Sequence, residues 1–162
     1  MSRLDSFIRR LQAQRACIDA AAETIAELDG PVFELGLGNG RTYDHLRERL
    51  GTREIFVFER QLAAHPDCIP DPEYLFLGDI HETLPAALAR FAGQVALIHS
   101  DIGTGNAAAN AAIAAFLSDY VTKFLRPDGL VMADQPMTLS DAEPQPLPEG
   151  VKPGRYFIYR KR

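Results

Sequence analysis

The sequence predicts an α/β fold, with a doubly wound, mostly parallel sheet and helices on both faces. Short apolar runs of strand-forming residues alternate five times with segments whose apolar residues recur at helical spacing. Three glycines follow the first run, and an acidic residue follows each of the other four. Because parallel strands end at one edge of a sheet, these residues predict a ligand site at that edge.

Length and composition bound the kind of protein. The 162 residues fit one domain, and a content of 46% hydrophobic and 24% charged residues is typical of soluble globular proteins. No apolar run reaches the length of a membrane span, and the chain starts without a signal-peptide pattern, so we expect a cytoplasmic protein with no membrane partner. The net charge of −5 argues against a nucleic-acid partner. The two cysteines, Cys17 and Cys68, indicate neither a disulfide nor a zinc site.

We expect a single domain in three parts, namely an N-terminal helix in residues 1–30, a core in residues 31–135, and a proline-rich loop with a terminal strand in residues 136–162. Apolar residues recur every three or four positions from Leu4 to Leu28, and Gly30-Pro31 then ends the helix. This helix must lie against the sheet. Whether it also covers the ligand stays open.

The core elements are expected in strict alternation. Strands are expected at residues 32–35, 54–58, 74–77, 95–99 and 130–133, with helices starting near residue 43 and covering 82–91 and 106–125. Residues 126–129, Arg-Pro-Asp-Gly, end the last of these helices as a turn.

The pattern changes after Asp134. Residues 135–154 contain five prolines and cannot form a regular helix. One strand remains, at residues 156–160, and we expect it to pair antiparallel with the fifth strand because no crossover helix precedes it. The proline-rich loop is then a substrate lid, a contact in a homodimer, or a packed connection.

The first strand, Val32 to Leu35, leads directly into Gly36, Gly38 and Gly40. Glycine is needed in such a turn because the backbone takes dihedrals that other residues resist, and because a ligand approaches where a Cβ would stand. The amides at the start of the next helix offer hydrogen bonds and partial positive charge to an anionic group. The segment therefore predicts a ligand-binding loop.

The motif Glu-x-Gly-x-Gly-x-Gly, written by Glu34 and the three glycines, resembles the first motif of class I S-adenosyl-L-methionine (SAM)-dependent methyltransferases. The similarity covers about residues 31–135, and the whole chain resembles a family of small stand-alone bacterial SAM methyltransferases. The resemblance implies a Rossmann-like fold of that class, with a shortened C-terminal part that ends in one antiparallel strand. It also implies SAM as cofactor and methyl transfer to an unidentified small-molecule acceptor.

The resemblance assigns roles to individual positions. The three glycines pass under the methionine part of SAM, and Glu34 supports the loop or binds the amino group. Glu59 binds both ribose hydroxyls, while Asp79 and Ile80 meet the adenine. The complete expected cofactor site is Glu34, Gly36, Leu37, Gly38, Asn39, Gly40, Thr42, Glu59, Arg60, Asp79, Ile80 and Asp101.

Two carboxylates are the expected catalytic groups. Asp101 is the first candidate to position or deprotonate the acceptor, and Asp134 stands behind it. His99 is a further candidate, but its place inside an apolar strand favours a satisfied core histidine.

Three alternatives stay open. Asp101 with Asp134-Gln135 resembles the magnesium site of catechol-type O-methyltransferases, although Gln135 stands where that family has asparagine and Thr104 stands near its lysine. We therefore expect no metal. A catalytically silent SAM-binding protein would carry the same glycines. A nicotinamide-dependent oxidoreductase is disfavoured because the last glycine of its fingerprint would fall on Arg41.

Overall fold

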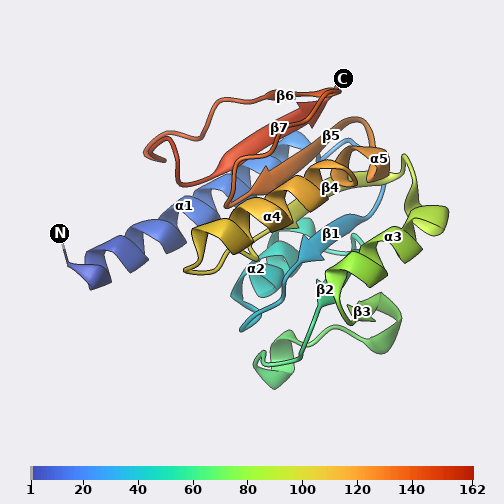
Figure 1. The fold of residues 1–162 in the computed structure, drawn as a ribbon, viewed down its shortest axis with the longest axis horizontal. Helices are drawn as coiled ribbons and strands as arrows, with labels where there is room; N and C mark the ends of the chain where they lie inside the picture. The colour runs from blue at the N-terminus through green and yellow to red at the C-terminus, as the bar shows by residue number, and fades with distance from the viewer. Residues whose placement is uncertain (1) are drawn as a thin grey trace.

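The computed structural model describes residues 2–162 and has a seven-stranded sheet with helices on both faces (Figure 1). The strand order is β3-β2-β1-β4-β5-β7-β6, and β1 to β5 are parallel. The strands are β1 (Val32–Leu35), β2 (Ile55–Glu59), β3 (Leu75–Leu77), β4 (Val95–Ser100), β5 (Leu125–Ala133), β6 (Ala142–Pro144) and β7 (Phe157–Lys161). The helices are α1 (Arg3–Thr24), α2 (Arg41–Leu50), α3 (Ile80–Phe91), α4 (Ala107–Ser118) and α5 (Val121–Phe124), with 3-10 turns at Pro66–Cys68 and Pro72–Tyr74. The predicted fold class is confirmed. Over residues 2–162 no helix combines the length and hydrophobicity needed to span a membrane.

The N-terminal helix is shorter than predicted, because the backbone carbonyls that follow it accept hydrogen bonds from an arginine side chain. Helix α1 ends at Thr24, not at Leu28. The guanidinium of Arg53 donates to the carbonyls of Ile25, Leu28 and Gly30 at 3.1, 2.6 and 2.9 Å. These carbonyls are therefore satisfied outside a helix. The apolar spacing continues past Thr24 because Ile25 still packs in the core.

The predicted helix over 106–125 is divided, and the fifth strand is longer than predicted. A turn at Asp119–Tyr120 separates α4 from α5. Strand β5 begins at Leu125, which pairs with Val95, and the register then shifts so that Leu130 pairs with Leu97. The expected turn residues 126–129 form the bulge between these two pairs. They include Asp128, at a φ of 67°.

The terminal strand is antiparallel to β5, as predicted. A further short strand, β6, was not predicted. It lies at the edge of the sheet and pairs antiparallel with β7. Pro144 is tolerated there because an edge strand leaves one side of its backbone unpaired. The three residues of β6 carry too little sequence signal to be separated from the proline-rich loop around them.

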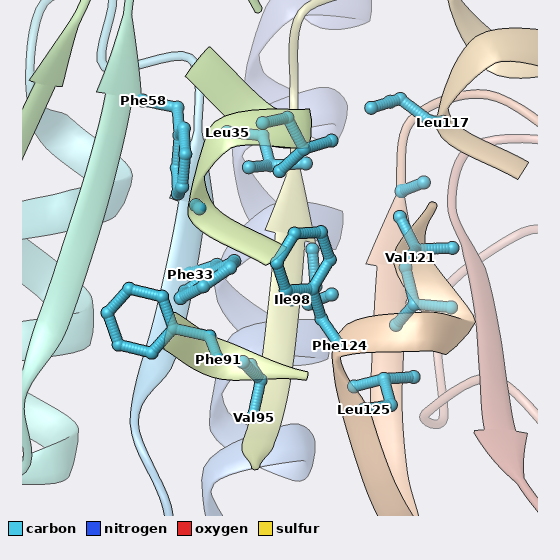
Figure 2. Close-up of a cluster of buried hydrophobic side chains, with 14 of the residues drawn as sticks. Phe33, Leu35, Phe58, Phe91, Val95, Ile98, Leu117, Val121, Phe124 and Leu125 are labelled. Carbon is cyan, nitrogen blue, oxygen red and sulfur yellow. The ribbon is translucent and has the colours of Figure 1, made fainter. Parts of the chain in front are cut away.

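Each face of the sheet carries its own hydrophobic core. On one face, α3, α4 and α5 cover a cluster around Phe33, part of which Figure 2 shows. The ring of Phe33 contacts four other phenylalanines, namely Phe56, Phe58, Phe91 and Phe124. On the other face, α1 and α2 pack on a second cluster that includes Ile18, Leu46 and Leu97. Because side chains alternate along a strand, Val32 and Glu34 of β1 face α1 and α2 while Phe33 faces α3 to α5.

The variant Ile98→Val tests the packing of the first core. Ile98 is fully buried, so loss of one methyl group is expected to lower the free energy of unfolding by about 1 kcal/mol. The same change at Ile8, which is 44% exposed on α1, serves as the matched control and is expected to change it by less than about 0.5 kcal/mol. Urea denaturation of the two variants measures both. Equal effects would mean that the core is not packed as described.

Candidate active site

Three cavities meet at the edge of the sheet where the parallel strands end. The first, of about 440 Å³, lies over Glu59, Asp79 and Ile80. The second, of about 210 Å³, lies between α1 and the glycine loop, and the third, of about 390 Å³, lies beside Asp134. Gly36 lines the first and second cavities, Arg10 the second and third, and Thr104 the first and third. The three cavities therefore lie next to one another around this edge of the sheet.

The glycine loop enters this site with three left-handed residues. Gly36, Gly38 and Gly40 have φ values of 88°, 53° and 86°. A Cβ at Gly36 would collide with the side chain of Ile102, whereas a Cβ at Gly38 would have open space around it. Gly40 begins α2 without a side-chain cap. The loop thus presents bare backbone at the start of α2, next to the second cavity.

The loop is held by the carboxylate of Glu59 at the end of β2. One oxygen of Glu59 accepts from the backbone N–H groups of Leu37 and Gly38 at 2.7 and 2.9 Å. The other accepts from the N–H groups of Arg60 and Gln61 at 2.6 and 3.1 Å. These four bonds join the glycine loop to the turn after β2. The expected role of Glu59 at the ribose stays a prediction.

The rest of the expected adenosine site lines the first cavity. Asp79 caps α3 and accepts from the backbone N–H of His81 at 2.9 Å. This hydrogen bond is the main cause of a lowered pKa for Asp79, and the ring of His81 contributes a second hydrogen bond to the same carboxyl. Ile80, Arg60 and Glu59 line the same cavity. Sequence reasoning missed its opposite wall, which Ile113 of α4 helps to form.

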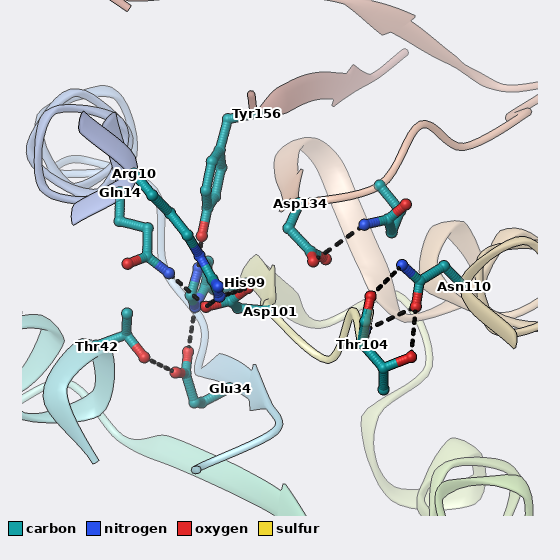
Figure 3. Close-up of polar contacts among 11 residues, drawn as sticks. Arg10, Gln14, Glu34, Thr42, His99, Asp101, Thr104, Asn110, Asp134 and Tyr156 are labelled. Carbon is teal, nitrogen blue, oxygen red and sulfur yellow. Dashed lines mark hydrogen bonds and ion pairs between the residues drawn. The ribbon is translucent and has the colours of Figure 1, made fainter. Parts of the chain in front are cut away.

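Asp101 lies in the second cavity and is bound by two side chains of α1. The guanidinium of Arg10 donates to both of its oxygens at 2.9 and 3.0 Å, and the amide of Gln14 donates to one of them (Figure 3). Phe7 and Leu11 of α1 line the same cavity. Helix α1 therefore forms a wall of the second cavity, and its covering of the ligand stays a prediction.

A chain of buried polar side chains runs beneath the site (Figure 3). The register of β1 and β4 places Glu34 beside His99, and the two bond at 2.5 Å through Nδ1. Glu34 also accepts from the hydroxyl of Thr42 at 2.5 Å, and His99 Nε2 lies 3.1 Å from the hydroxyl of Tyr156. Glu34 and His99 are both fully buried. Glu34 thus supports the start of α2 rather than lining a cavity.

Two members of this chain have shifted pKa values. Burial alone would lower the pKa of His99, but the charge and hydrogen bond of Glu34 outweigh it, so the pKa lies above its ordinary 6.5. Burial raises the pKa of Tyr156 far above its ordinary 10. Tyr156 therefore stays a neutral phenol, and the residue lines the third cavity.

Asp134 lies in the third cavity with Gly103 and Gln135. Burial raises the pKa of its carboxyl and the charge of Asp101 adds to the shift, against hydrogen bonds from Gln135 and the Gly103 backbone. A Cβ at Gly103 would collide with the Asp134 side chain. A raised pKa is one property of a general base or acid, so Asp134 stays a candidate for that role.

The loop after Asp101 is fixed by α4. The carbonyl oxygen of the Asn110 side chain accepts from the backbone N–H of Thr104 at 2.7 Å, and its amide donates to the Thr104 carbonyl at 2.8 Å (Figure 3). Thr104 is thereby held between the first and third cavities.

The residues that sequence reasoning missed come mainly from α1 and from the segment before β7. Arg10 and Gln14 are four residues apart, so they share a helix face, but nothing in the sequence distinguishes that face from a solvated one. Tyr156 stood at the start of a predicted strand and carried no motif. Their contacts with Asp101 and His99 span 57 to 91 residues of chain.

The glycine loop, the acids at the strand ends and the sheet order define a Rossmann-like protein of class I methyltransferase type. The chain belongs to a family of S-adenosyl-L-methionine methyltransferases, whose model matches residues 1–161. The crystal structure of an S-adenosyl-L-methionine methyl transferase from Silicibacter pomeroyi DSS-3 is 48% identical, covers 100% of this chain and 99% of that one, and has a TM-score of 0.95. The SAH-bound Podospora anserina methyltransferase PaMTH1 shares the fold, with 14% identity over 100% of this chain and 80% of that one and a TM-score of 0.60. No protein of curated function matches the sequence.

The protein is therefore a SAM-dependent methyltransferase, and its site fits that cofactor. The first cavity has the size of a small-molecule site, within about 300–1,000 Å³. The open space at Gly38 and the uncapped start of α2 lie beside the second cavity, where the methionine part is expected. The family membership decides against a nicotinamide oxidoreductase and against a silent binding protein.

The variant Glu59→Ala tests the cofactor site. Loss of the carboxylate leaves four backbone N–H groups without their acceptor and frees the glycine loop, at a cost of about 1.4 kcal/mol in binding. The dissociation constant of S-adenosylhomocysteine (SAH) is expected to rise about tenfold. Isothermal titration calorimetry measures it. Glu54→Ala, at the exposed residue just before the same strand, is the matched control and should leave SAH affinity unchanged.

Proposed function

We propose that this enzyme methylates a small-molecule acceptor bound in the third cavity, with Asp134 as the general base. The observation that supports this proposal most is the way the three cavities share residues. The third cavity borders the expected methionine site through Arg10 and the expected adenosine site through Thr104. An acceptor in the third cavity would therefore lie next to the point where the two halves of the cofactor meet.

Each residue of the proposed site has a separate role in the reaction. SAM, when bound, supplies an electrophilic methyl group on a positively charged sulfur. Asp134 takes the proton that an oxygen or nitrogen acceptor loses as its bond to the methyl carbon forms. Both oxygens of the Asp101 carboxylate accept hydrogen bonds from Arg10 and one also accepts from Gln14, so we place Asp101 second to Asp134 as the base. We assign to Asp101 the positioning of α1 over the second cavity, and to Tyr156 a neutral wall of the acceptor cavity.

In the metal-assisted alternative Asp101 would be the first magnesium ligand, but here it binds the guanidinium of an arginine. Arg10 already pairs with both oxygens of Asp101. We therefore expect methyl transfer to continue at an unchanged rate in EDTA.

The test is a methyl-transfer assay on the whole enzyme. SAH release is measured with a panel of small oxygen and nitrogen nucleophiles, and with RNA and protein as competing acceptor classes. Turnover of a small molecule, with the same rate in EDTA, is the expected result. Methylation of RNA or protein alone would overturn the small-molecule assignment, and loss of activity in EDTA would favour the catechol-type site.

A further inference from the structure

A basic groove lies beside the acceptor cavity, between α1 and the end of the proline-rich loop. Its volume is about 410 Å³. Four of its side chains are cationic, namely Arg9 and Arg15 from α1 and Lys152 and Arg155 from the loop. The groove contains one acid, Glu149.

The four cations lack partners. Within residues 2–162, none of them forms a salt bridge or a side-chain hydrogen bond. Four other arginines of the described residues pair with carboxylates, as Arg49 does with Asp19 at 3.0 Å and Arg160 with Asp128 at 2.9 Å. In a chain with a net charge of −5, four unpaired cations in one groove produce a local positive potential that attracts anions.

The groove adjoins the acceptor cavity. Arg155 lines both. Arg9 of the groove and Arg10 of the cavity are consecutive residues of α1. The loop that carries Lys152 is bounded by Gly150 and Gly154, at φ values of 82° and 81°, so its path is set by two left-handed turns.

From these observations we infer that the methyl acceptor carries an anionic group, a carboxylate or a phosphate, which the basic groove binds while the nucleophilic atom lies in the third cavity. The inference rests on the proposed function of that cavity. Arginine suits this task because its planar guanidinium matches a carboxylate or phosphate with two parallel hydrogen bonds, and Lys152 adds a point charge. The groove holds the anionic end and thereby sets the orientation of the acceptor.

Binding of simple anions to the SAH-saturated enzyme tests the inference. Inorganic phosphate and malonate are titrated separately at low ionic strength, and the two arms distinguish phosphate from carboxylate recognition. We expect at least one to bind, and its dissociation constant to rise at least fivefold in Arg9→Gln/Lys152→Gln. The double variant Arg3→Gln/Arg162→Gln removes the same charge at exposed positions outside the groove and should leave that constant unchanged.

Other outcomes overturn the inference. Equal anion binding in both double variants would show that only net charge matters. A single-stranded oligonucleotide that binds more tightly than either anion, through the same two residues, would make the groove a nucleic-acid surface. A dimer that dissociates in Arg9→Gln/Lys152→Gln, with no anion binding, would make it a subunit contact.

Measuring the affinity for SAH distinguishes failure of this inference from failure of the proposed function. It is measured on the wild type and on both double variants before the anions are added. Normal SAH binding and methyl transfer to a small molecule, without any preference for anions at the groove, would overturn the inference alone. Methyl transfer to no small molecule would overturn the proposed function as well.

Discussion

Replacing Asp134 by asparagine is expected to lower kcat/KM by about 100- to 10,000-fold, the range that a positioned general base contributes. Asparagine keeps the size of the side chain but cannot take a proton from the acceptor. Because burial makes a charge costly at this position and asparagine carries none, the variant should fold at least as well as the wild type. The rate is measured by SAH release with the acceptor identified in the screen.

The pH profile shows whether Asp134 acts as a base. Burial and the neighbouring Asp101 raise its pKa above the ordinary 3.8, so kcat/KM of the wild type should fall on the acid side at a pH above that value. Asp134→Asn should remove this acid limb. Asp101→Asn is the matched comparison, and it should retain the limb but move it to lower pH, because the Asp101 charge that helps to raise the pKa of Asp134 is lost. An unchanged limb in Asp134→Asn would exclude Asp134 as the base.

Breaking the pair of Glu34 and His99 is expected to cause the largest loss of stability. His99→Leu leaves the carboxylate of Glu34 fully buried and without its main partner, at a cost of about 3–5 kcal/mol. The double variant Glu34→Leu/His99→Leu removes both charged groups and should lose much less than the sum of the two single variants. Guanidinium denaturation measures all three. His65→Leu, at an exposed histidine, is the control and should change the free energy of unfolding little.

The same pair predicts how stability depends on pH. Glu34 raises the pKa of His99 in the folded protein above 6.5, so the folded state holds a proton that the unfolded chain has lost. The stabilisation is therefore complete below about pH 6.5 and declines as the pH rises through the raised value. The stability difference between the wild type and His99→Leu should shrink in that direction. A difference that stays constant into the alkaline range would show that the pair is not charged.

The sequence predicts the glycine loop and the strand-end acids of the site well, because the patterns that mark them lie within short stretches of the chain. The glycines after β1 and the acids after β2 to β5 follow from strand ends that apolar runs mark clearly. The end of α1 could not be predicted, because Arg53, 23 to 28 residues away, supplies the hydrogen bonds there. The pairing of Asp101 with Arg10 was equally hidden, since it depends on where α1 crosses the sheet edge. Such contacts are set by tertiary packing and leave no local pattern.

The third cavity is formed partly by segments outside the parallel core, and this has a consequence for redesign. Its walls combine strand-end residues with Arg10 of α1 and with Gly154 to Tyr156, which lie outside the consecutive parallel core. Exchange of the surface positions of α1 and of the proline-rich segment between relatives could therefore transfer acceptor choice, while the methyl-donor half of the enzyme stays intact. Chimaeras of this kind would combine one constant SAM-binding core with exchangeable acceptor-binding segments.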